Sequence, residues 1–178
     1  MEARNHDKNG AIPKSHMSRK IQNFFIMRTL GNILWHIPFL GFLSSFVHFL
    51  IGGLFTITVV GAPIGLGLIQ YSKFLLTPFS SAMVSKDDLN MEQNAAWKTY
   101  STILWILYIP FGLIFCVLSI FQIVGLFVTI IGIPVAIVIA KSLPTYFKPV
   151  NKKCVPVAVR EELERRQAQK DIAAHLGK

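Results

Sequence analysis

The chain has 178 residues, 52% of them hydrophobic, and its 18 basic and nine acidic side chains give a formal net charge of +9. No charged residue occurs from Thr29 to Ser72 or from Thr99 to Ala140. Runs of this length exclude an ordinary soluble domain, because about 18 consecutive apolar residues already indicate a membrane span. The sequence therefore predicts an integral membrane protein.

The charged residues are confined to residues 1–28, 73–98 and 141–178. Basic residues near the ends of membrane spans face the cytoplasm. A basic surface beside an anionic leaflet also explains the net charge without nucleic acid. We therefore expect all three segments on the cytoplasmic side of the inner (plasma) membrane, with membrane lipids as partners and no nucleic-acid partner.

Five segments follow from the distribution of charge and hydropathy. The first should be a flexible basic tail, because it is polar and contains residues that disfavour regular structure. The last should be a cytosolic helix, in which Glu161 lies four residues before Arg165, and Glu162 four before Arg166, in the stabilising order. The segments are the tail (1–26), a first repeat (27–84), a cytosolic linker (85–98), a second repeat (99–155) and the C-terminal helix (156–178).

Each uncharged block is long enough to cross a membrane twice. As one helix the first block would extend about 66 Å, roughly twice the thickness of a 30 Å hydrocarbon core. Paired glycines relax the backbone, so we place one fold-back at Gly52-Gly53 and the other around Gln122–Gly125. The expected spans are residues 29–50, 54–76, 99–120 and 126–146. We thus predict an all-α membrane protein with four transmembrane helices in two tandem hairpin repeats, multi-pass, with both termini in the cytoplasm.

The two halves share glycines and prolines in register. Agreement over about 50 residues indicates an internal repeat, with two spans in each copy. At an offset of 71, the shared pairs are Gly61 with Gly132, Pro63 with Pro134, and Pro78 with Pro149.

Within a helix, a proline lacks an N–H and clashes with the preceding turn, so Pro63 and Pro134 predict two kinked helices. One interpretation is that the kinks at these glycine–proline motifs line a pathway, as broken helices do in transporters. The other is that they only let short helices pack closely, with Gly61, Gly65 and Gly67 allowing near contact. We favour packing and keep the pathway as the alternative.

Four ionisable residues are candidates for a functional role. Lys73 and Lys141 fall on the same helical face as the preceding motif proline, near the cytosolic interface, where they could anchor the helices or bind an anion or lipid headgroup. His36 and His48 lie in the first span, where ionisable groups are costly. They could hydrogen-bond across a helix interface, or act in a proton relay or ligand contact.

The sequence contains no nucleophile elbow, metal-ligand helix or phosphate loop. We therefore expect no catalytic residue, no cofactor and no metal, and we predict that the protein is not an enzyme. The preferred hypothesis is a structural or accessory membrane component that assembles as a homo-oligomer or with a membrane-protein partner. The alternative is a small channel or transporter.

Three stretches together resemble the YccF family: Met27–Trp35, Gly61-Ala62-Pro63 and Ile131–Pro134. The resemblance covers about residues 27 to 150. Members are small bacterial inner-membrane proteins with two inner membrane component domains and no assigned activity, so the resemblance implies membrane location and two repeats. Ala136 stands where the family's second copy has a glycine, which places a tight helix contact there in question.

Overall fold

The computed structural model describes residues 14–37 and 39–177 and is mostly helical. In chain order the elements are α1 (Lys14–His36), α2 (Gly41–Ile57), α3 (Ala62–Leu76), β1 (Ser81–Ser85), α4 (Ala95–Phe127), a 3₁₀ turn η1 (Ile130–Gly132), α5 (Ile133–Phe147), β2 (Lys152–Pro156) and α6 (Val157–Leu176). Residues 1–13 of the predicted N-terminal tail lie outside the described residues. Helix α1 begins at Lys14, within the segment predicted as a flexible tail.

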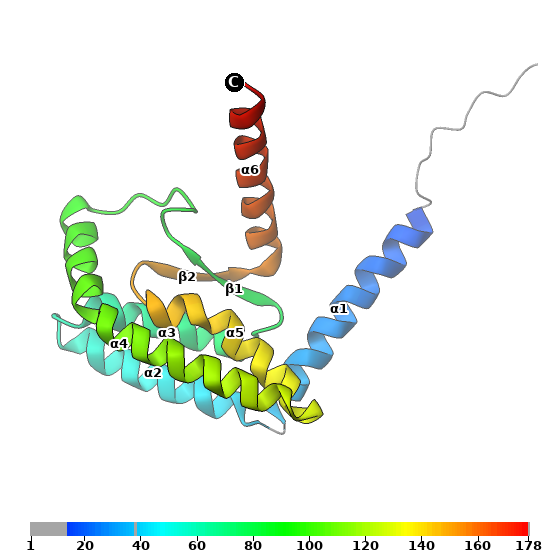
Figure 1. Ribbon diagram of the computed structural model, residues 1–178, viewed down its shortest axis with the longest axis horizontal. Helices are drawn as coiled ribbons and strands as arrows, with labels where there is room; N and C mark the ends of the chain where they lie inside the picture. The colour runs from blue at the N-terminus through cyan, green and yellow to red at the C-terminus, as the bar shows by residue number, and fades with distance from the viewer. Residues whose placement is uncertain (1–13, 38, 178) are drawn as a thin grey trace, which may run out of the picture.

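The elements form three layers (Figure 1). The two strands pair as an antiparallel ribbon, which lies with α6 on one side of the molecule. Helices α3 and α5 contact the ribbon, α2 packs against α3, and α4 packs against α5. Helices α2 and α4 therefore lie on the side away from the ribbon, and α3 and α5 form the middle layer.

The glycine–proline motifs begin helices and do not kink them. Pro63 and Pro134 occupy the first turn of α3 and α5, where the missing N–H has no intrahelical partner to lose. Just before each helix a threonine hydroxyl accepts a hydrogen bond from the motif glycine, Gly61 N to Thr58 Oγ1 and Gly132 N to Thr129 Oγ1, both 3.2 Å. The prediction of two kinked helices is therefore wrong, because each motif forms the turn of a hairpin.

The predicted fold-back points are also wrong, because both lie within helices. Gly52 and Gly53 lie inside α2, and residues 122–125 lie inside α4. A Cβ at Gly52 would lie 2.9 Å from the carbonyl oxygen of Gly65, so this glycine permits close contact between α2 and α3. The sequence alone does not distinguish a glycine that forms a helix contact from one that forms a turn.

Two features of the structure do not follow from the sequence pattern. The first predicted span is broken, since α1 ends at His36, α2 begins at Gly41, and their axes differ by 74°. The two strands lie in segments for which the pattern predicts only a loop and the end of the second hairpin. Their register pairs Ser81 with Pro156 and Ser85 with Lys152.

By length and composition, fewer helices qualify as candidate membrane spans than the four predicted, and the four-span count is not confirmed. Among the described residues, two segments qualify as candidate spans, Ala95–Phe127 and Ile130–Phe147, and a third does if Gln22–His36 and Gly41–Ile57 form one bent span. Helix α3 has 15 residues and extends about 22 Å, short of a 30 Å hydrocarbon core.

The two halves of the fold correspond closely. An offset of 71 carries Ala62–Leu76 of α3 onto Ile133–Phe147 of α5, and β1 onto β2. The hydrogen bonds that extend the ribbon correspond as well. Lys86 N donates to Asn151 O at 2.9 Å, and Val157 N donates to Ser80 O at 3.0 Å.

The buried core lies between the middle layer and the ribbon. It is formed by Trp35, Tyr71, Phe74, Leu75 and Val138, with partly buried Met83 and Cys154 from the ribbon packed against it. Beside it, a Cβ at Gly67 in α3 would collide with the backbone carbonyl of Pro149, which follows α5. This contact fixes the distance between the two halves.

We expect Gly67→Ala to destabilise the protein by about 1–3 kcal/mol, because overpacking against a backbone group forces the halves apart. Thermal unfolding of the purified protein in mild detergent would measure the change. Gly53→Ala is the matched control, since no atom other than those of its chain neighbours and its own helix backbone lies within 4 Å of the place its added methyl group would take, and alanine favours helix. Equal melting temperatures for the two variants would contradict the assignment.

Candidate functional site

The candidate site is the interface between the ribbon and the middle helices, which we call the ribbon interface. Between the two middle helices, the hydroxyl of Tyr71 in α3 is bonded to two hydroxyls of α5, Ser142 Oγ at 2.9 Å and Tyr146 Oη at 2.8 Å. Ser142 in turn donates to the carbonyl of Val138 at 2.8 Å. Tyr71 and Ser142 are almost completely buried, so these bonds satisfy groups that water does not reach.

A second pair of contacts holds the outer helices to the middle layer. Ser45 Oγ of α2 donates to the carbonyl of Ser72 at 2.6 Å. At the corresponding place in the second hairpin, Cys116 Sγ of α4 faces the carbonyl of Leu143 at 3.6 Å. Both contacts reach a backbone carbonyl of the middle helix from a small side chain of the outer helix.

Two cavities flank the ribbon at opposite ends. The larger, about 210 Å³, lies between β1 and α6, and Lys141, Arg160, Glu161 and Glu164 are among its lining residues. The smaller, about 70 Å³, lies between α3, the chain before β2 and the start of α4. Its polar lining consists of Gln70, Lys86, Asn151 and Lys152, with the Trp97 ring beside them.

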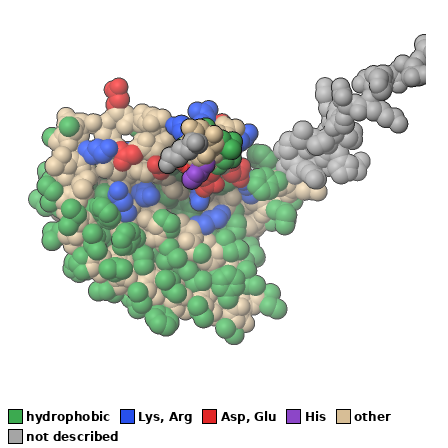
Figure 2. All heavy atoms as spheres, turned by 45° about the horizontal axis from the view of Figure 1, so that its top comes forward, with side chains coloured by type: hydrophobic (Ala, Val, Ile, Leu, Met, Phe, Trp, Pro, Cys, Tyr) green, Lys and Arg blue, Asp and Glu red, His purple; other side chains and the backbone are tan. Residues whose placement is uncertain are grey.

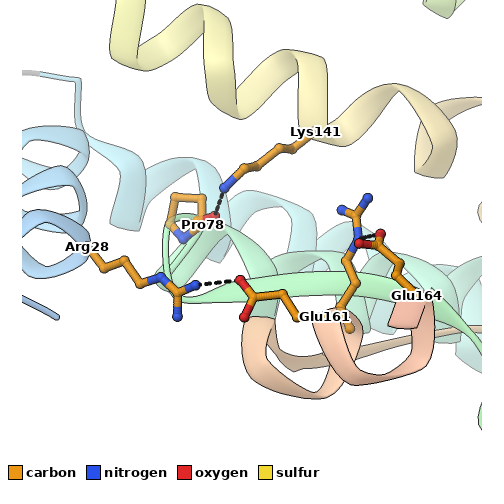
Figure 3. Close-up of polar contacts among 6 residues, drawn as sticks. Arg28, Pro78, Lys141, Glu161 and Glu164 are labelled. Carbon is orange, nitrogen blue, oxygen red and sulfur yellow. Dashed lines mark hydrogen bonds and ion pairs between the residues drawn. The ribbon is translucent and has the colours of Figure 1, made fainter. Parts of the chain in front are cut away.

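The larger cavity is neutralised by ion pairs within the chain. Arg28 of α1 contacts Glu161 of α6 at 2.9 Å, and Arg160 contacts Glu164 at 2.7 Å (Figure 3). Lys141 Nζ donates to the carbonyl of Pro78 at 3.2 Å, which ties α5 to the segment before β1. These contacts fasten α1 and α6 to the ribbon interface and leave little unbalanced charge in this cavity.

The smaller cavity differs because its two lysines form no ion pair among the described residues. Burial lowers the pKa of Lys152, and the nearby carboxylate of Asp88 partly offsets that effect. The cavity therefore has a positive lining, with Gln70 facing β2 through a hydrogen bond from Cys154 N to Gln70 Oε1 of 3.1 Å.

The four ionisable residues that the sequence analysis selected lie apart from one another in the structure. Lys141 is engaged with Pro78, whereas Lys73 is exposed on α3 and makes no hydrogen bond or ion pair within the described chain. His36 Nε2 lies 2.7 Å from the carbonyl of Leu76, and His48 Nδ1 lies 2.7 Å from that of Ser44. The His36 contact crosses from α1 to α3 and fits the interpretation of a hydrogen bond across a helix interface, whereas the His48 contact lies within α2.

The small residues of the motifs also have internal partners. Gly65 faces Gly52 and Thr56 across the first hairpin, and a Cβ added to it would lie 2.6 Å from the carbonyl oxygen of Gly52. Ala136, which replaces a glycine of the resemblance, is fully buried. The close packing predicted for these residues is found inside the chain, and the second hairpin accommodates the alanine methyl group.

Sequence reasoning did not find Tyr71, Ser142 or the smaller cavity. An offset of 71 places Tyr71 opposite Ser142, but different residue types conceal that relation. Among the described residues, no group of three or more His, Cys, Asp or Glu side chains is placed to hold a metal ion.

The arrangement defines the class of protein. Large apolar side chains cover one part of the surface and the Lys, Arg, Asp and Glu side chains gather on another, as Figure 2 shows, and this construction is that of a membrane protein. Residues 30–81 match the family model of YccF, the inner membrane component domain. The first half of the chain is thus similar to the YccF domain, as the resemblance predicts. Neither the search of curated proteins nor that of solved structures returns a match.

Tyr71→Phe should lower the free energy of unfolding by about 1–2 kcal/mol, because the change removes the hydrogen bonds of the buried Tyr71 hydroxyl to Ser142 and Tyr146. Chemical or thermal unfolding in mild detergent would measure it. Tyr108→Phe is the matched control, since no hydrogen bond of the Tyr108 hydroxyl occurs in the described structure. A loss of equal size in both variants would show that the hydroxyl network is not the cause.

Burial raises the pKa of the Cys154 thiol in β2, so its thiolate fraction at neutral pH is below that of a free cysteine. In the Cys116→Ser variant, alkylation by iodoacetamide should be slow at pH 7.5. The rate should increase about tenfold per pH unit and continue to rise beyond the ordinary thiol pKa of about 8.5. Mass spectrometry of the intact protein would follow the reaction, with denatured protein as control. A plateau at the same pH in both states would contradict the prediction.

Proposed function

We propose that the protein is a non-enzymatic structural or accessory component of the inner membrane, with both termini and the ribbon on the cytoplasmic side. The proposal rests on the observation that the inward-facing groups of the two hairpins contact each other. Gly67 lies against Pro149, and Tyr71 bonds to Ser142. What remains exposed is a broad apolar surface for lipid and a charged ribbon from which α6 projects (Figure 1).

The orientation is supported by charge. The segments of ribbon, linker and α6 contain most of the described lysines and arginines, and basic residues at span ends favour the cytoplasmic side. The Arg28–Glu161 ion pair holds α1 near α6, so the two ends of the described chain leave the molecule on the same side (Figure 1).

We further propose that the two hairpins are copies of one unit, related by a two-fold axis through Met83 and Cys154. These residues are partners at the centre of the ribbon and are separated by the repeat offset of 71. The matched lengths of α3 and α5 and the paired bonds at the ribbon ends support the same relation. An axis perpendicular to the ribbon gives both copies the same orientation in the membrane.

The channel or transporter hypothesis loses its main support. It depended on Pro63 and Pro134 breaking membrane-spanning helices, and both prolines lie at the beginnings of helices. Between α3 and α5, the Tyr71 hydroxyl and the ring of Tyr146 occupy the centre of the interface. Both described cavities lie at the ends of the ribbon, beside residues of β1 or of the chain next to β2.

Reconstitution tests the proposal directly. Liposomes containing the full-length protein should release anions, cations and small neutral solutes no faster than protein-free liposomes, with an added pore-forming peptide as the positive control. In native membranes, amine-reactive crosslinking through exposed lysines such as Lys73 and Lys98 should trap a second copy or a membrane protein in fixed stoichiometry. Saturable solute flux, or a strict monomer without any crosslinked partner, would overturn the accessory role.

A further inference from the structure

We propose that the hairpins α2–α3 and α4–α5 lie in a single leaflet, parallel to the membrane plane, and that neither crosses the bilayer. The partner of the apolar surface is then the acyl-chain region of the cytoplasmic leaflet, and the ribbon sits among its headgroups. This inference concerns how the protein contacts lipid, and it holds whether or not the protein has an accessory role.

Helix α3 contacts the charged side of the molecule along its whole length. Just before its beginning, the carbonyl of Val60 accepts a hydrogen bond of 2.8 Å from Tyr100 Oη. Tyr100 lies two residues from Lys98, which forms an exposed ion pair of 2.7 Å with Asp87. In the middle of the helix, Gln70 accepts a hydrogen bond from Cys154 of the ribbon.

At its other end α3 leads directly into the ribbon, because it ends at Leu76 and β1 begins at Ser81. A helix that crosses a bilayer reaches the headgroups of one leaflet with only one of its ends. Helix α3 contacts the charged layer at its beginning, middle and end, and its length of about 22 Å is less than the hydrocarbon thickness of about 30 Å. It therefore lies along the headgroup layer.

Helix α5 has the same relation to the charged side. Lys141 is the ninth of its 15 residues and donates to the carbonyl of Pro78, beside the larger cavity. Pro149, just beyond its end, lies against Gly67 of α3. In a crossing helix Lys141 would lie near mid-membrane, where a charged group is costly. In a helix parallel to the membrane it reaches the polar layer directly.

The outer helices provide the surface that enters the lipid. Helix α2 buries only Gly41, Ser45 and Gly52, and α4 buries only Ser101, Gly112 and Ser119. Their large apolar side chains are exposed and cover the side opposite the charged residues, as Figure 2 shows. The axes of α1 and α2 differ by 74°. Helix α1 therefore meets the helical layer at a steep angle, and α2 runs along that layer.

The exposed side chains of the hairpin turns are suited to the hydrocarbon region of the membrane and not to the water on its periplasmic side. Their most exposed side chains are Val59, Val60, Val128, Ile130 and Ile131. The threonines at the turns accept from Gly61 N and Gly132 N, which satisfies backbone groups that lipid cannot. A turn that emerged into the periplasm would expose these apolar side chains to water.

Spin-label depth measurements test the proposal. In a Cys116→Ser, Cys154→Ser background, single labels would replace Leu43, Leu50 and Ile57 of α2. All three are exposed and lie seven residues apart, so they share one helical face. Accessibility to oxygen and to an aqueous nickel complex, in vesicles containing anionic phospholipid, gives the depth of each label. Labels at Leu107, Ile114 and Phe121 examine α4 in the same way, because these residues are also exposed.

We expect the three labels of each helix to lie at similar depths in one leaflet. If the helix crosses the membrane, Leu43 and Ile57 would differ by about 21 Å along the normal, with Leu50 deepest. A progression of that kind in either helix overturns the proposal for its hairpin. Because all six side chains face away from the protein, normal folding is expected and is checked by the elution volume of each variant.

Sidedness provides a second measurement. In spheroplasts, a membrane-impermeant maleimide should not modify Val60→Cys or Ile131→Cys, because both turns remain in the cytoplasmic leaflet. Glu92→Cys, in the exposed segment after β1, is the control and should react only in inverted vesicles. Modification of either turn cysteine from the periplasmic side would show that its hairpin crosses the membrane. Solute flux plays no part in these measurements, so their failure is distinguishable from failure of the accessory role.

Discussion

The bonds between Tyr71 of α3 and the hydroxyls of Ser142 and Tyr146 of α5 hold the two halves of the molecule together at their centre. Hydroxyls buried this deeply are costly unless they are paired, so the helices must meet in one register. That register places the ribbon above the helices and leaves α2 and α4 on the opposite side. The separation of charged and apolar surfaces depends on this small polar cluster.

The sequence was sufficient to predict a helical membrane protein and the positions at which its halves correspond. Two long uncharged blocks and the offset of Pro63 from Pro134 are local properties that need no partner to be recognised. The C-terminal helix was also predicted, and the Glu162–Arg166 pair is present at 2.9 Å. The predicted Glu161–Arg165 pair is not formed, because Glu161 pairs with Arg28 and Arg165 with Glu162. The YccF match over residues 30–81 agrees with the resemblance in the first half.

The remaining features depended on contacts between distant residues. Pro63 has the same chemistry at a helix start as in a helix interior, and only the Thr58–Gly61 turn determines which applies. Each strand has five residues and is stable only because it pairs with a segment 71 positions away. The lining of the smaller cavity comes from four separate stretches of the chain, so no spacing in the sequence predicts it.

The register of the ribbon has a consequence for the origin of the chain. Met83 and Cys154 are separated by the repeat offset of 71 and pair with each other. The two strands therefore pair through the same edge. A shorter chain with one hairpin and one strand would therefore have the means to pair with a second molecule of itself. The proposed repeat would make the present protein such a dimer fused into one polypeptide, in which the linker between β1 and α4 keeps the two halves at a high effective concentration.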